Sequence, residues 1–397
     1  MHNQFEQRKV ENMKIGIEGQ RLFRKNKHGM DFVTLELIHG LQQIDRRNEY
    51  VIFIQPDSDI CIEEIANFKI QAFSSLAYPA WEQWALPRIA AKERVDILHC
   101  TSNTAPIWSS IPQILTLHDV IFLEKPQTTG SSKNWYQRFG NQYRKAIVPT
   151  VAQRCQMIIT VSNYEREQIL KTLPLPQGKL KVVYNGVSRR FKQIQNKREL
   201  VNIKEKYRLP KKFILFLGNT DPKKNLKGVL LAYSIFVENS ETVIQLVIVD
   251  LKQKYLSEVL KELNLPGLQE HIVLPGYIPN RDLPAVYNLS DLFLYPSLRE
   301  SFGLPVLEAM ACGVPVIASN TSSMPEVAGD AALLVDPKDA LLLANDIGAM
   351  LSHNNLRQRM IRKGFRQAER FSWQNTAEQV LQIYENTSKS RVTRMAA

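Results

Sequence analysis

The sequence predicts an α/β fold made of two doubly wound, Rossmann-like domains that face each other across a cleft. Short apolar runs alternate with amphipathic helical stretches in the first half, which is typical of parallel strands covered by helices on both faces. The alternation restarts after a charged segment at residues 188–212, which holds few large apolar residues. The length of 397 residues also allows two or three domains of ordinary size.

The first series of elements begins with a strand expected at Lys14–Glu18, followed by a polar basic loop and an amphipathic helix at residues 30–43. Further strands are expected at residues 50–55, 97–100, 111–117, 157–161 and 181–184, and the second series is expected at residues 213–218, 243–250, 271–274, 292–295 and 314–319. These series predict a first domain over residues 13–190, a linker over 191–212 and a second domain over 213–372.

The charge of the chain is unevenly distributed. The sequence holds 51 Lys and Arg against 39 Asp and Glu, a formal net charge of +12. Residues 1–205 hold 29 basic and 20 acidic side chains, an excess of +9, while residues 206–397 hold 22 and 19, an excess of +3. A basic half predicts a partner rich in phosphate, such as a phosphorylated substrate, an anionic membrane or nucleic acid. With 44% hydrophobic and 23% charged residues, the composition excludes disorder and coiled coil.

Sequence features of a metal site or a secreted protein are missing from the chain. The cysteines, at Cys61, Cys100, Cys155 and Cys312, have neither zinc-site spacing nor a disulfide pattern. The acidic pair Asp57 and Asp59 follows a proline in a polar turn and is not expected to bind a metal. No apolar signal segment or membrane span is present in the sequence. We therefore expect a cytoplasmic protein that needs no metal or other cofactor.

The most informative segment is YPSLRESFGLPVLEAMACG at residues 295–313, where a strand ends, a loop turns and a helix begins near Pro305. The backbone N–H groups of residues 301–304 would point from the helix N-terminus into the cleft, which suits a diphosphate. Glu300 and Glu308 bracket this loop, and each carboxylate can accept hydrogen bonds from the vicinal hydroxyls of a sugar or ribose. The alternative is that both are solvated surface charges.

A second junction between a strand and a helix lies at FILFLGNTDPKKNLKGVLLAY. Lys223 and Lys224 precede a helix expected from about Asn225, where a cation is unfavourable for the helix dipole. A bound phosphate would offset this cost, so the pair is a candidate phosphate site. The alternative is a solvated lysine pair in a turn.

These segments resemble the retaining glycosyltransferases of family 4, which have the GT-B fold. ESFGLPVLEAMACGVPVIAS followed by PEVAGDAALLVDP is similar to the E-x7-E region of that family, and GNTDPKKN is similar to its phosphate loop. WEQWALP, TLHDVIFL, VSNYEREQI and VVYNGVSRRF are similar to segments of its first domain, and FSW is similar to the start of its C-terminal return helix, expected here at residues 373–388. The resemblance spans about residues 13–388.

The resemblance implies roles for individual residues. Glu300 would bind the donor sugar, Glu308 the ribose, and Lys224 the diphosphate leaving group. His118, at the end of an apolar strand, would approach the transferred sugar, although such a histidine is also often structural. The implied catalytic residues are Glu300, His118 and Lys224, and the implied donor-binding residues are Gly29, Lys223, Lys224, Asn225, Tyr277, Ile278, Glu300, Ser301, Phe302, Gly303, Leu304 and Glu308.

The version of these motifs resembles bacterial mannosyltransferases of surface polysaccharide assembly. It implies transfer of mannose from GDP-mannose to a saccharide or a polyprenyl-diphosphate-linked acceptor, without a nucleic-acid partner. A nucleotide-sugar epimerase of the same fold and an inert nucleotide-sugar-binding subunit remain alternatives. Asn219 and Lys223 stand where many family members have arginine. Because lysine lacks the two-pronged geometry of arginine and asparagine lacks its charge, an inert binding subunit remains an alternative.

The segment KNWYQRFGNQYRK at residues 133–145 interleaves aromatic and basic side chains. One interpretation is that its aromatic residues face the core. The other is that the segment contacts an anionic membrane or a lipid-linked acceptor at the inner face of the plasma membrane.

Overall fold

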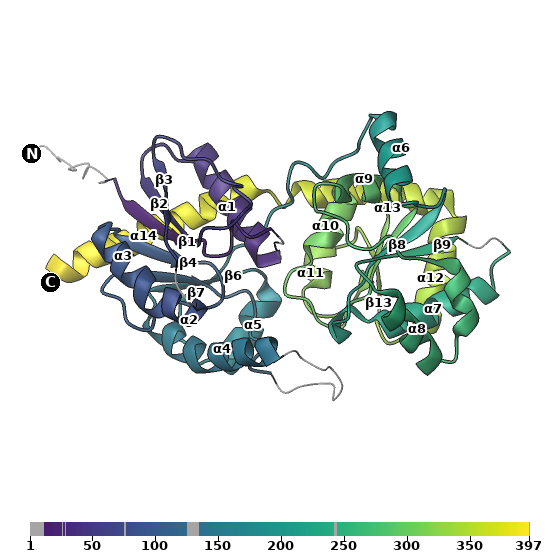
Figure 1. Cartoon of the computed structure of the whole chain (residues 1–397), viewed down its shortest axis with the longest axis horizontal. Helices are drawn as coiled ribbons and strands as arrows, with labels where there is room; N and C mark the ends of the chain where they lie inside the picture. Colours follow the sequence, from purple (N-terminus) through teal and green to yellow (C-terminus); the bar gives the residue numbers. More distant parts are fainter. Residues whose placement is uncertain are drawn as a thin grey trace, which may run out of the picture.

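The computed structural model describes residues 12–25, 27, 29–74, 77–124, 135–241 and 244–396. Two parallel sheets lie side by side, each with helices on both faces (Figure 1). This arrangement confirms the predicted α/β fold with two Rossmann-like domains. All eleven predicted strands are present in the described residues, with their ends within two residues of the expected positions.

The first sheet has the strand order β3-β2-β1-β4-β5-β6-β7, and all its pairs are parallel. Its strands are β1 (Lys14–Glu18), β2 (Glu49–Ile54), β3 (Phe68–Ala72), β4 (Ile97–Cys100), β5 (Gln113–Thr116), β6 (Met157–Thr160) and β7 (Leu180–Val182). Its helices are α1 (Gly29–Ile44), α2 (Tyr78–Ala80), the π-helical turn η1 (Trp81–Ala85), α3 (Leu86–Lys92), α4 (Trp135–Arg154) and α5 (Asn163–Thr172).

The second sheet has the order β10-β9-β8-β11-β12-β13 and is also parallel throughout. Its strands are β8 (Phe213–Leu217), β9 (Gln245–Val249), β10 (Ile272–Val273), β11 (Leu292–Tyr295), β12 (Val316–Ser319) and β13 (Leu333–Val335). The remaining helices are α6 (Lys197–Lys206), η2 (Pro222–Lys224), α7 (Leu226–Glu238), α8 (Gln253–Glu262), η3 (Pro266–His271), α9 (Leu283–Leu289), α10 (Leu304–Ala311), α11 (Met324–Ala328), α12 (Ala340–Ser352), α13 (Asn354–Glu369) and α14 (Trp373–Ala396).

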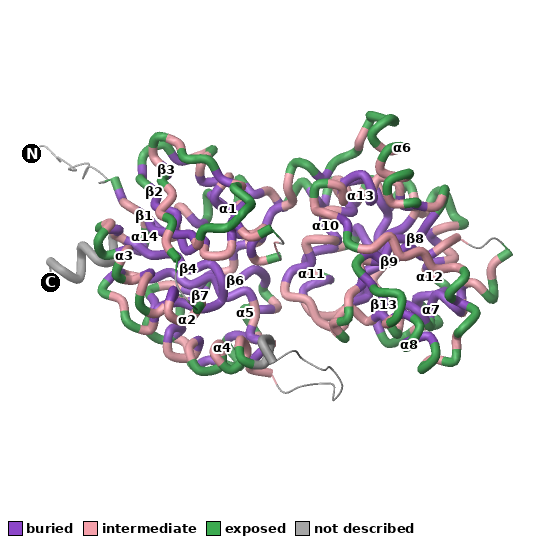
Figure 2. Tube along the Cα trace, viewed as in Figure 1, coloured by how far each residue is buried: buried purple, intermediate pink, exposed green. Residues whose placement is uncertain are grey.

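Each sheet separates two apolar layers because successive side chains of a strand point to opposite faces. In β2, Val51 and Phe53 belong to one core cluster, while Tyr50, Ile52 and Ile54 belong to the cluster on the other face. A strand that is buried on both faces has a continuous run of apolar residues. For this reason the central strands could be predicted from the sequence. Figure 2 shows the buried strands at the centre of both domains, with exposed residues on outer elements such as α6.

The chain crosses between the domains twice, and the two crossings lie against each other. Val187 forms a parallel bridge with Ser372, and its backbone N–H donates to the carbonyl of Phe371 at 2.9 Å. Gly186 is required by this contact, since a Cβ there would lie 2.1 Å from the backbone N of Trp373. After the second crossing, α14 returns to the first domain and buries Ala377, Val380 and Tyr384 against its core (Figure 1).

The segment expected to be a linker, residues 191–212, is more structured than its composition suggested. It contains α6, and Phe191 and Leu209 are buried in the core of the second domain. The apolar runs of the sequence did not indicate β3 and β13, each of which is one edge strand of its sheet. The strand β3 is partly exposed and carries Lys69 and Gln71, and β13 has only 3 residues, so neither gives the long apolar run of a central strand.

Candidate functional site

The candidate site lies at the carboxyl edge of the second sheet, where the strand order reverses. The chain runs from β8 outwards through β9 to β10, and then returns to place β11 on the other side of β8. The loops that leave β8 and β11 therefore diverge and leave a crevice, which is the usual ligand position in open α/β sheets. Lys223 and Lys224 follow β8, and Glu300 follows β11.

Lys224, Glu300 and Tyr295 form one cluster in this crevice. The Nζ of Lys224 lies 2.5 Å from Oε1 of Glu300 and donates to the hydroxyl of Tyr295 at 2.8 Å. Burial works to lower the pKa of Lys224, but Tyr295 and Glu300 together raise it above its ordinary value. Lys224 therefore stays positively charged and is able to bind a phosphate.

Asn225 holds the loop that carries Lys224. Its backbone is left-handed, with φ of 61°, and its Nδ2 donates to the carbonyls of Pro296 at 3.0 Å and Pro337 at 2.6 Å. Asparagine tolerates this conformation better than most residues. Lys223 instead lies 3.4 Å from Asp221 and is 39% exposed, so it is not part of the Lys224 cluster.

The helix α10 begins at the predicted turn. Gly303 is its N-cap, with φ of 100°, and a Cβ there would lie 2.2 Å from Cε of Met324. The left-handed conformation favours glycine, and any other side chain would also have to displace the end of Met324. The loop before it is held by Ser323, whose hydroxyl donates to the carbonyls of Glu300 and Phe302. Phe302 is buried, so it offers the crevice only its backbone.

Glu308 lies one turn inside α10, beside a cavity of about 240 Å³ between the two domains. Burial raises the pKa of Glu308 to about 7, against the opposing effects of Arg190 and a hydrogen bond from Tyr287 at 3.2 Å. The cavity is lined from the first domain by Gly29, Phe32 and Glu36, and from the second by Tyr277, Ile278, Leu304 and Glu308. Its apolar walls and carboxylate are suited to a flat ring attached to a polyhydroxy group.

His118 follows β5 in the first domain and is buried. Its Nε2 lies 2.9 Å from the carbonyl of Thr101, which requires Nε2 to carry the proton, so Nδ1 is left as an acceptor. Among the described residues, Nδ1 has no hydrogen-bond partner. Burial lowers the pKa of His118, which favours the neutral ring. A neutral acceptor at this position can bind a hydroxyl group.

Two polar bridges join the domains beside the site. Arg299, next to Glu300, contacts the buried carboxylate of Glu165 with both terminal nitrogens and lies 2.9 Å from Glu124. Glu326 accepts from Tyr184 at 2.6 Å and from the backbone N–H of Asn163 at 2.8 Å. The loop that carries Glu300 is therefore held in place by the opposite domain.

Ser301 extends this contact between the domains. Its carbonyl accepts from Ser162 at 2.8 Å, and its hydroxyl lies 3.4 Å from Asp119, the neighbour of His118.

The sequence did not reveal every residue of the site. Arg299 and Tyr295 were not among the predicted site residues, although a hydroxyl-bearing tyrosine at the end of an otherwise apolar strand was a visible signal. In the aromatic and basic segment, Lys133 and the side chains of Trp135, Tyr136 and Arg138 lie outside the described residues. Phe139 is 56% exposed, whereas Tyr143 points inwards and donates to Glu82. The inward position therefore holds for Tyr143, while contact of this segment with a membrane or a lipid-linked acceptor stays a prediction.

Neither a metal cluster nor a membrane span was found in the described ranges. They hold no group of three or more His, Cys, Asp or Glu side chains placed to share a metal ion. Of the acidic pair, Asp59 lies 2.5 Å from Lys27, while Asp57 lines a separate cavity. No described helix is both long and apolar enough to cross a bilayer. The absence of a metal cofactor from the reaction stays a prediction.

Comparison with known proteins matches both halves of the chain to families. The profile described as Glycosyltransferase Family 4 matches residues 28–191, and the profile described as Glycosyl transferases group 1 matches residues 197–367. The O-antigen chain mannosyltransferase B of Escherichia coli is 30% identical over 311 residues, which cover 78% of each chain.

Two solved structures show the fold over nearly the whole chain. A sucrose-phosphate synthase from Thermosynechococcus elongatus has a TM-score of 0.74 at 18% identity and covers 96% of this chain and 100% of its own. The structure of HepE from Anabaena in complex with UDP and glucose has a TM-score of 0.70 at 16% identity, with coverage of 94% and 100%.

Proposed function

This chain belongs to the group 1 glycosyltransferases and is built on the GT-B fold, and from that premise we propose that it transfers mannose from GDP-mannose with retention of configuration. The acceptor would be a saccharide or a polyprenyl-diphosphate-linked oligosaccharide of a surface polysaccharide. The observation that carries the transferase chemistry is the partly buried contact of Lys224 with Glu300 beside the N-terminus of α10. The choice of mannose is supported by the mannosyltransferase relative at 30% identity.

In the proposed reaction, the acceptor hydroxyl attacks the anomeric carbon while the bond from that carbon to the diphosphate oxygen breaks. The diphosphate keeps the electron pair, and one of its oxygens takes the acceptor proton on the same face of the sugar. Negative charge grows on the diphosphate during this step. Lys224 and the free N–H groups at the start of α10 would stabilise that charge more strongly in the transition state than in the ground state.

The other predicted residues fit around this step. Glu300 would bind hydroxyls of the mannose, and Nδ1 of His118 would accept from a further hydroxyl of the same sugar. The nucleoside would occupy the cavity next to Glu308, with the ribose on that carboxylate and the base between Tyr277 and Ile278. Gly29 lines the same cavity from the first domain. Lys223 points away from the cluster, so we assign the main charge to Lys224.

The two alternative functions, a nucleotide-sugar epimerase and an inert binding subunit, are less well supported. An epimerase of the same fold would act on the nucleotide sugar without an acceptor, and both family matches favour transfer instead. An inert subunit would have no need for a partly buried lysine held against a carboxylate at the proposed phosphate position.

The donor can be identified by thermal shift with the mannose and glucose conjugates of GDP, UDP and ADP. A ligand at 100 times its dissociation constant adds about 2.7 kcal/mol to the stability of the folded state. We expect GDP-mannose to raise the midpoint of thermal unfolding by several degrees and to be slowly hydrolysed without an acceptor. The same donor should stabilise Lys224→Gln much less. Stabilisation by a UDP or ADP sugar but not by GDP-mannose would contradict the donor assignment, and no stabilisation by any of them would contradict the transferase site.

We also propose peripheral contact with an anionic membrane, through a surface of the first domain formed by Trp84, Arg88, Trp108 and Arg154. Trp84 is 64% exposed and Trp108 is 73% exposed, and both line one groove together with Arg88. The guanidinium of Arg154 lies 4.0 Å from the centre of the Trp108 ring. Exposed tryptophans beside arginines are suited to the headgroup region of a bilayer. Such contact would place the enzyme at the cytoplasmic face of the plasma membrane.

Liposome sedimentation tests this surface. We expect the full chain to bind phosphatidylglycerol vesicles, and Trp84→Ala/Trp108→Ala to bind about tenfold more weakly, because each ring loses its burial in the interface. Leu341→Ala is the matched control, since Leu341 is also exposed but lies on the second domain. Equal binding by the double variant and the control, or no binding by wild type, would contradict the proposal.

A further inference from the structure

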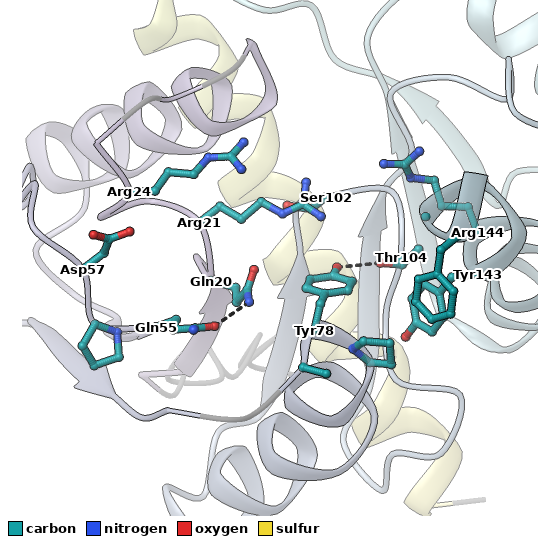
Figure 3. Close-up of a pocket in the computed structure, with 15 residues that line it drawn as sticks. Gln20, Arg21, Arg24, Gln55, Asp57, Tyr78, Ser102, Thr104, Tyr143 and Arg144 are labelled. Atoms are coloured by element: carbon teal, nitrogen blue, oxygen red, sulfur yellow. Dashed lines mark hydrogen bonds between the residues drawn. The ribbon is translucent and has the colours of Figure 1, made fainter. Parts of the chain in front are cut away.

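A second cavity, of about 460 Å³, lies at the carboxyl edge of the first sheet and has no part in the donor site. It occupies the point where that sheet also reverses its order, since β1 is flanked by β2 on one side and β4 on the other. Its walls come from the segments that follow these strands and from α2 and α4 (Figure 3). The two sheets therefore each present one crevice of the kind in which α/β sheets bind ligands.

The wall of this cavity carries three guanidinium groups. They belong to Arg21 and Arg24, which follow β1, and to Arg144, which comes from α4 (Figure 3). Arg24 is paired with Asp31 at 2.6 Å. Arg21 and Arg144, in contrast, make no ion pair with any of the residues that the structure describes.

Arg21 and Arg144 are held in position by contacts with uncharged side chains. Burial works to lower the pKa of Arg21, but Tyr78 and the carboxylates of Glu18, Asp31 and Glu82 raise it above its ordinary value. The guanidinium of Arg21 lies 4.9 Å from the centre of the Tyr78 ring, and that of Arg144 donates to the side-chain oxygen of Asn141 at 2.9 Å. Burial and then the positive charge of Arg21 lower the pKa of Arg144. Two cations that repel each other across a cavity gain most from an anion placed between them.

The acidic groups near the cavity do not fill that position. Asp57 is the carboxylate on the wall, and Figure 3 places it on the far side of the cavity from Arg144. Glu82 lies beneath the floor and is occupied, since it accepts from Tyr78 at 2.6 Å, from Tyr143 at 2.5 Å and from Thr104 and Gln83. Glu18, also buried, accepts from Thr101.

The floor of the cavity is rigid. Glu82 lies in the π-helical turn η1 and fixes the hydroxyls of Tyr78 and Thr104, which line the cavity. Isolated π-helical turns are frequent at functional sites. A network with every acceptor satisfied keeps its side chains in one arrangement, as a binding site for a defined group requires.

We propose that Arg21 and Arg144 bind a phosphate or diphosphate group of the acceptor in this cavity. The proposal rests on the proposed function, because it assigns the acceptor of the same reaction to an anionic class. Asp119 links this cavity to the donor site. Its charge partly opposes the lowering of the Arg144 pKa, and its carboxylate lies 3.4 Å from the hydroxyl of Ser301 in the loop before α10. The phosphate could belong to a lipid carrier or to a free sugar phosphate, which share this chemistry.

Calorimetric titration of the full chain with geranyl diphosphate, and separately with inorganic pyrophosphate, tests the proposal. We expect Arg21→Gln/Arg144→Gln to weaken binding of geranyl diphosphate at least about 30-fold, because two charge-assisted contacts are lost. In Lys224→Gln, the part of geranyl diphosphate binding that depends on Arg21 and Arg144 should remain. Arg46→Gln, on an exposed arginine of the same domain, is the matched control.

The two probes identify the source of the phosphate. Tighter binding of geranyl diphosphate than of pyrophosphate by wild type assigns a lipid carrier, and equal binding assigns a free phosphate ester. Loss of binding in Lys224→Gln but not in Arg21→Gln/Arg144→Gln would overturn the proposal, because the probe would then occupy the donor site. If the double glutamine variant does not fold, Arg21→Lys/Arg144→Lys replaces it, with binding weakened to an intermediate extent.

The thermal-shift panel with nucleotide sugars keeps the two proposals separate. Binding of geranyl diphosphate that depends on Arg21 and Arg144, in a protein that no nucleotide sugar stabilises, would refute the donor proposal alone. If GDP-mannose stabilises the protein but replacement of Arg21 and Arg144 leaves diphosphate binding unchanged, only the acceptor proposal would be refuted.

Discussion

Replacing Lys224 with glutamine is expected to lower the rate of sugar transfer by about 10²- to 10³-fold, with a smaller change in KM for the donor. The side chain of Lys224 is 20% exposed and lies 2.5 Å from Glu300, so its charge acts in a site with little water. Glutamine keeps most of the length of the side chain but cannot neutralise the departing diphosphate. Steady-state kinetics with GDP-mannose and a mannosylated acceptor measure the effect.

Lys227→Gln is the matched control for this prediction. Lys227 lies in the first turn of α7, shortly after Lys224 in the chain, is 53% exposed and pairs with Glu262 on the surface. Its replacement is expected to leave turnover near the wild-type rate, because surface ion pairs contribute little. A loss of less than about tenfold in Lys224→Gln would show that the lysine does not stabilise the transition state.

Most of the sheet architecture was predictable because the central strands are buried on both faces. Runs such as FILFL and LFLY have no polar residue, and β11 starts and ends where the sequence indicated. The edge strand β3 was not predicted because it carries Lys69 and Gln71 and is partly exposed. The helix α6 within the segment 191–212 was not predicted for a similar reason, since it is largely charged, has no buried residue and packs only the partly buried Ile203 against the core.

The candidate site was predictable where it depends on local sequence. Gly303 and Pro305 mark the start of α10 through their own backbone preferences, so the turn could be placed from the sequence. Lys223 and Lys224 are neighbours with the same chemistry, and the sequence could not show that only Lys224 turns towards Glu300. That choice depends on the left-handed backbone of Asn225 and on contacts from two distant loops.

Contacts between the domains were beyond the reach of the sequence. Arg299 and Glu165 are 134 residues apart, and Arg21, which follows β1, and Arg144, in α4, line one cavity although they are far apart in the chain. No local pattern distinguishes these arginines from others in a chain with 51 basic residues. Charge counting placed the excess in the first half, but the fold decides which charges converge.

Replacing Arg299 with leucine is expected to destabilise the protein by about 3–5 kcal/mol at pH 8, because it leaves the buried carboxylate of Glu165 without its cation. Glu165 is fully buried and is contacted by both terminal nitrogens of Arg299. The midpoint of thermal unfolding, measured between pH 5 and pH 8, reports the change. We expect a loss of several degrees at pH 8 and a much smaller loss at pH 5.

The pH dependence follows from the direction of the pKa shift. Burial raises the pKa of Glu165 from 4.5 to about 7 even with Arg299 opposing it, so removal of Arg299 should raise it further. In the variant, the folded state therefore binds a proton that the unfolded state releases above about pH 4.5. Stability is highest below that pH and falls as the pH rises towards the pKa of the folded state.

The double variant Glu165→Gln/Arg299→Leu separates the buried charge from the lost packing of Arg299. If the charge is the cause, the double variant should recover most of the thermal midpoint at pH 8 and lose the additional pH dependence, because glutamine does not ionise. Arg299→Leu alone would then be the less stable protein despite having one substitution fewer. An equal loss in both variants, or a loss in Arg299→Leu that is the same at pH 5 and pH 8, would show instead that the arginine acts through its contacts with Glu124 and the Glu300 backbone.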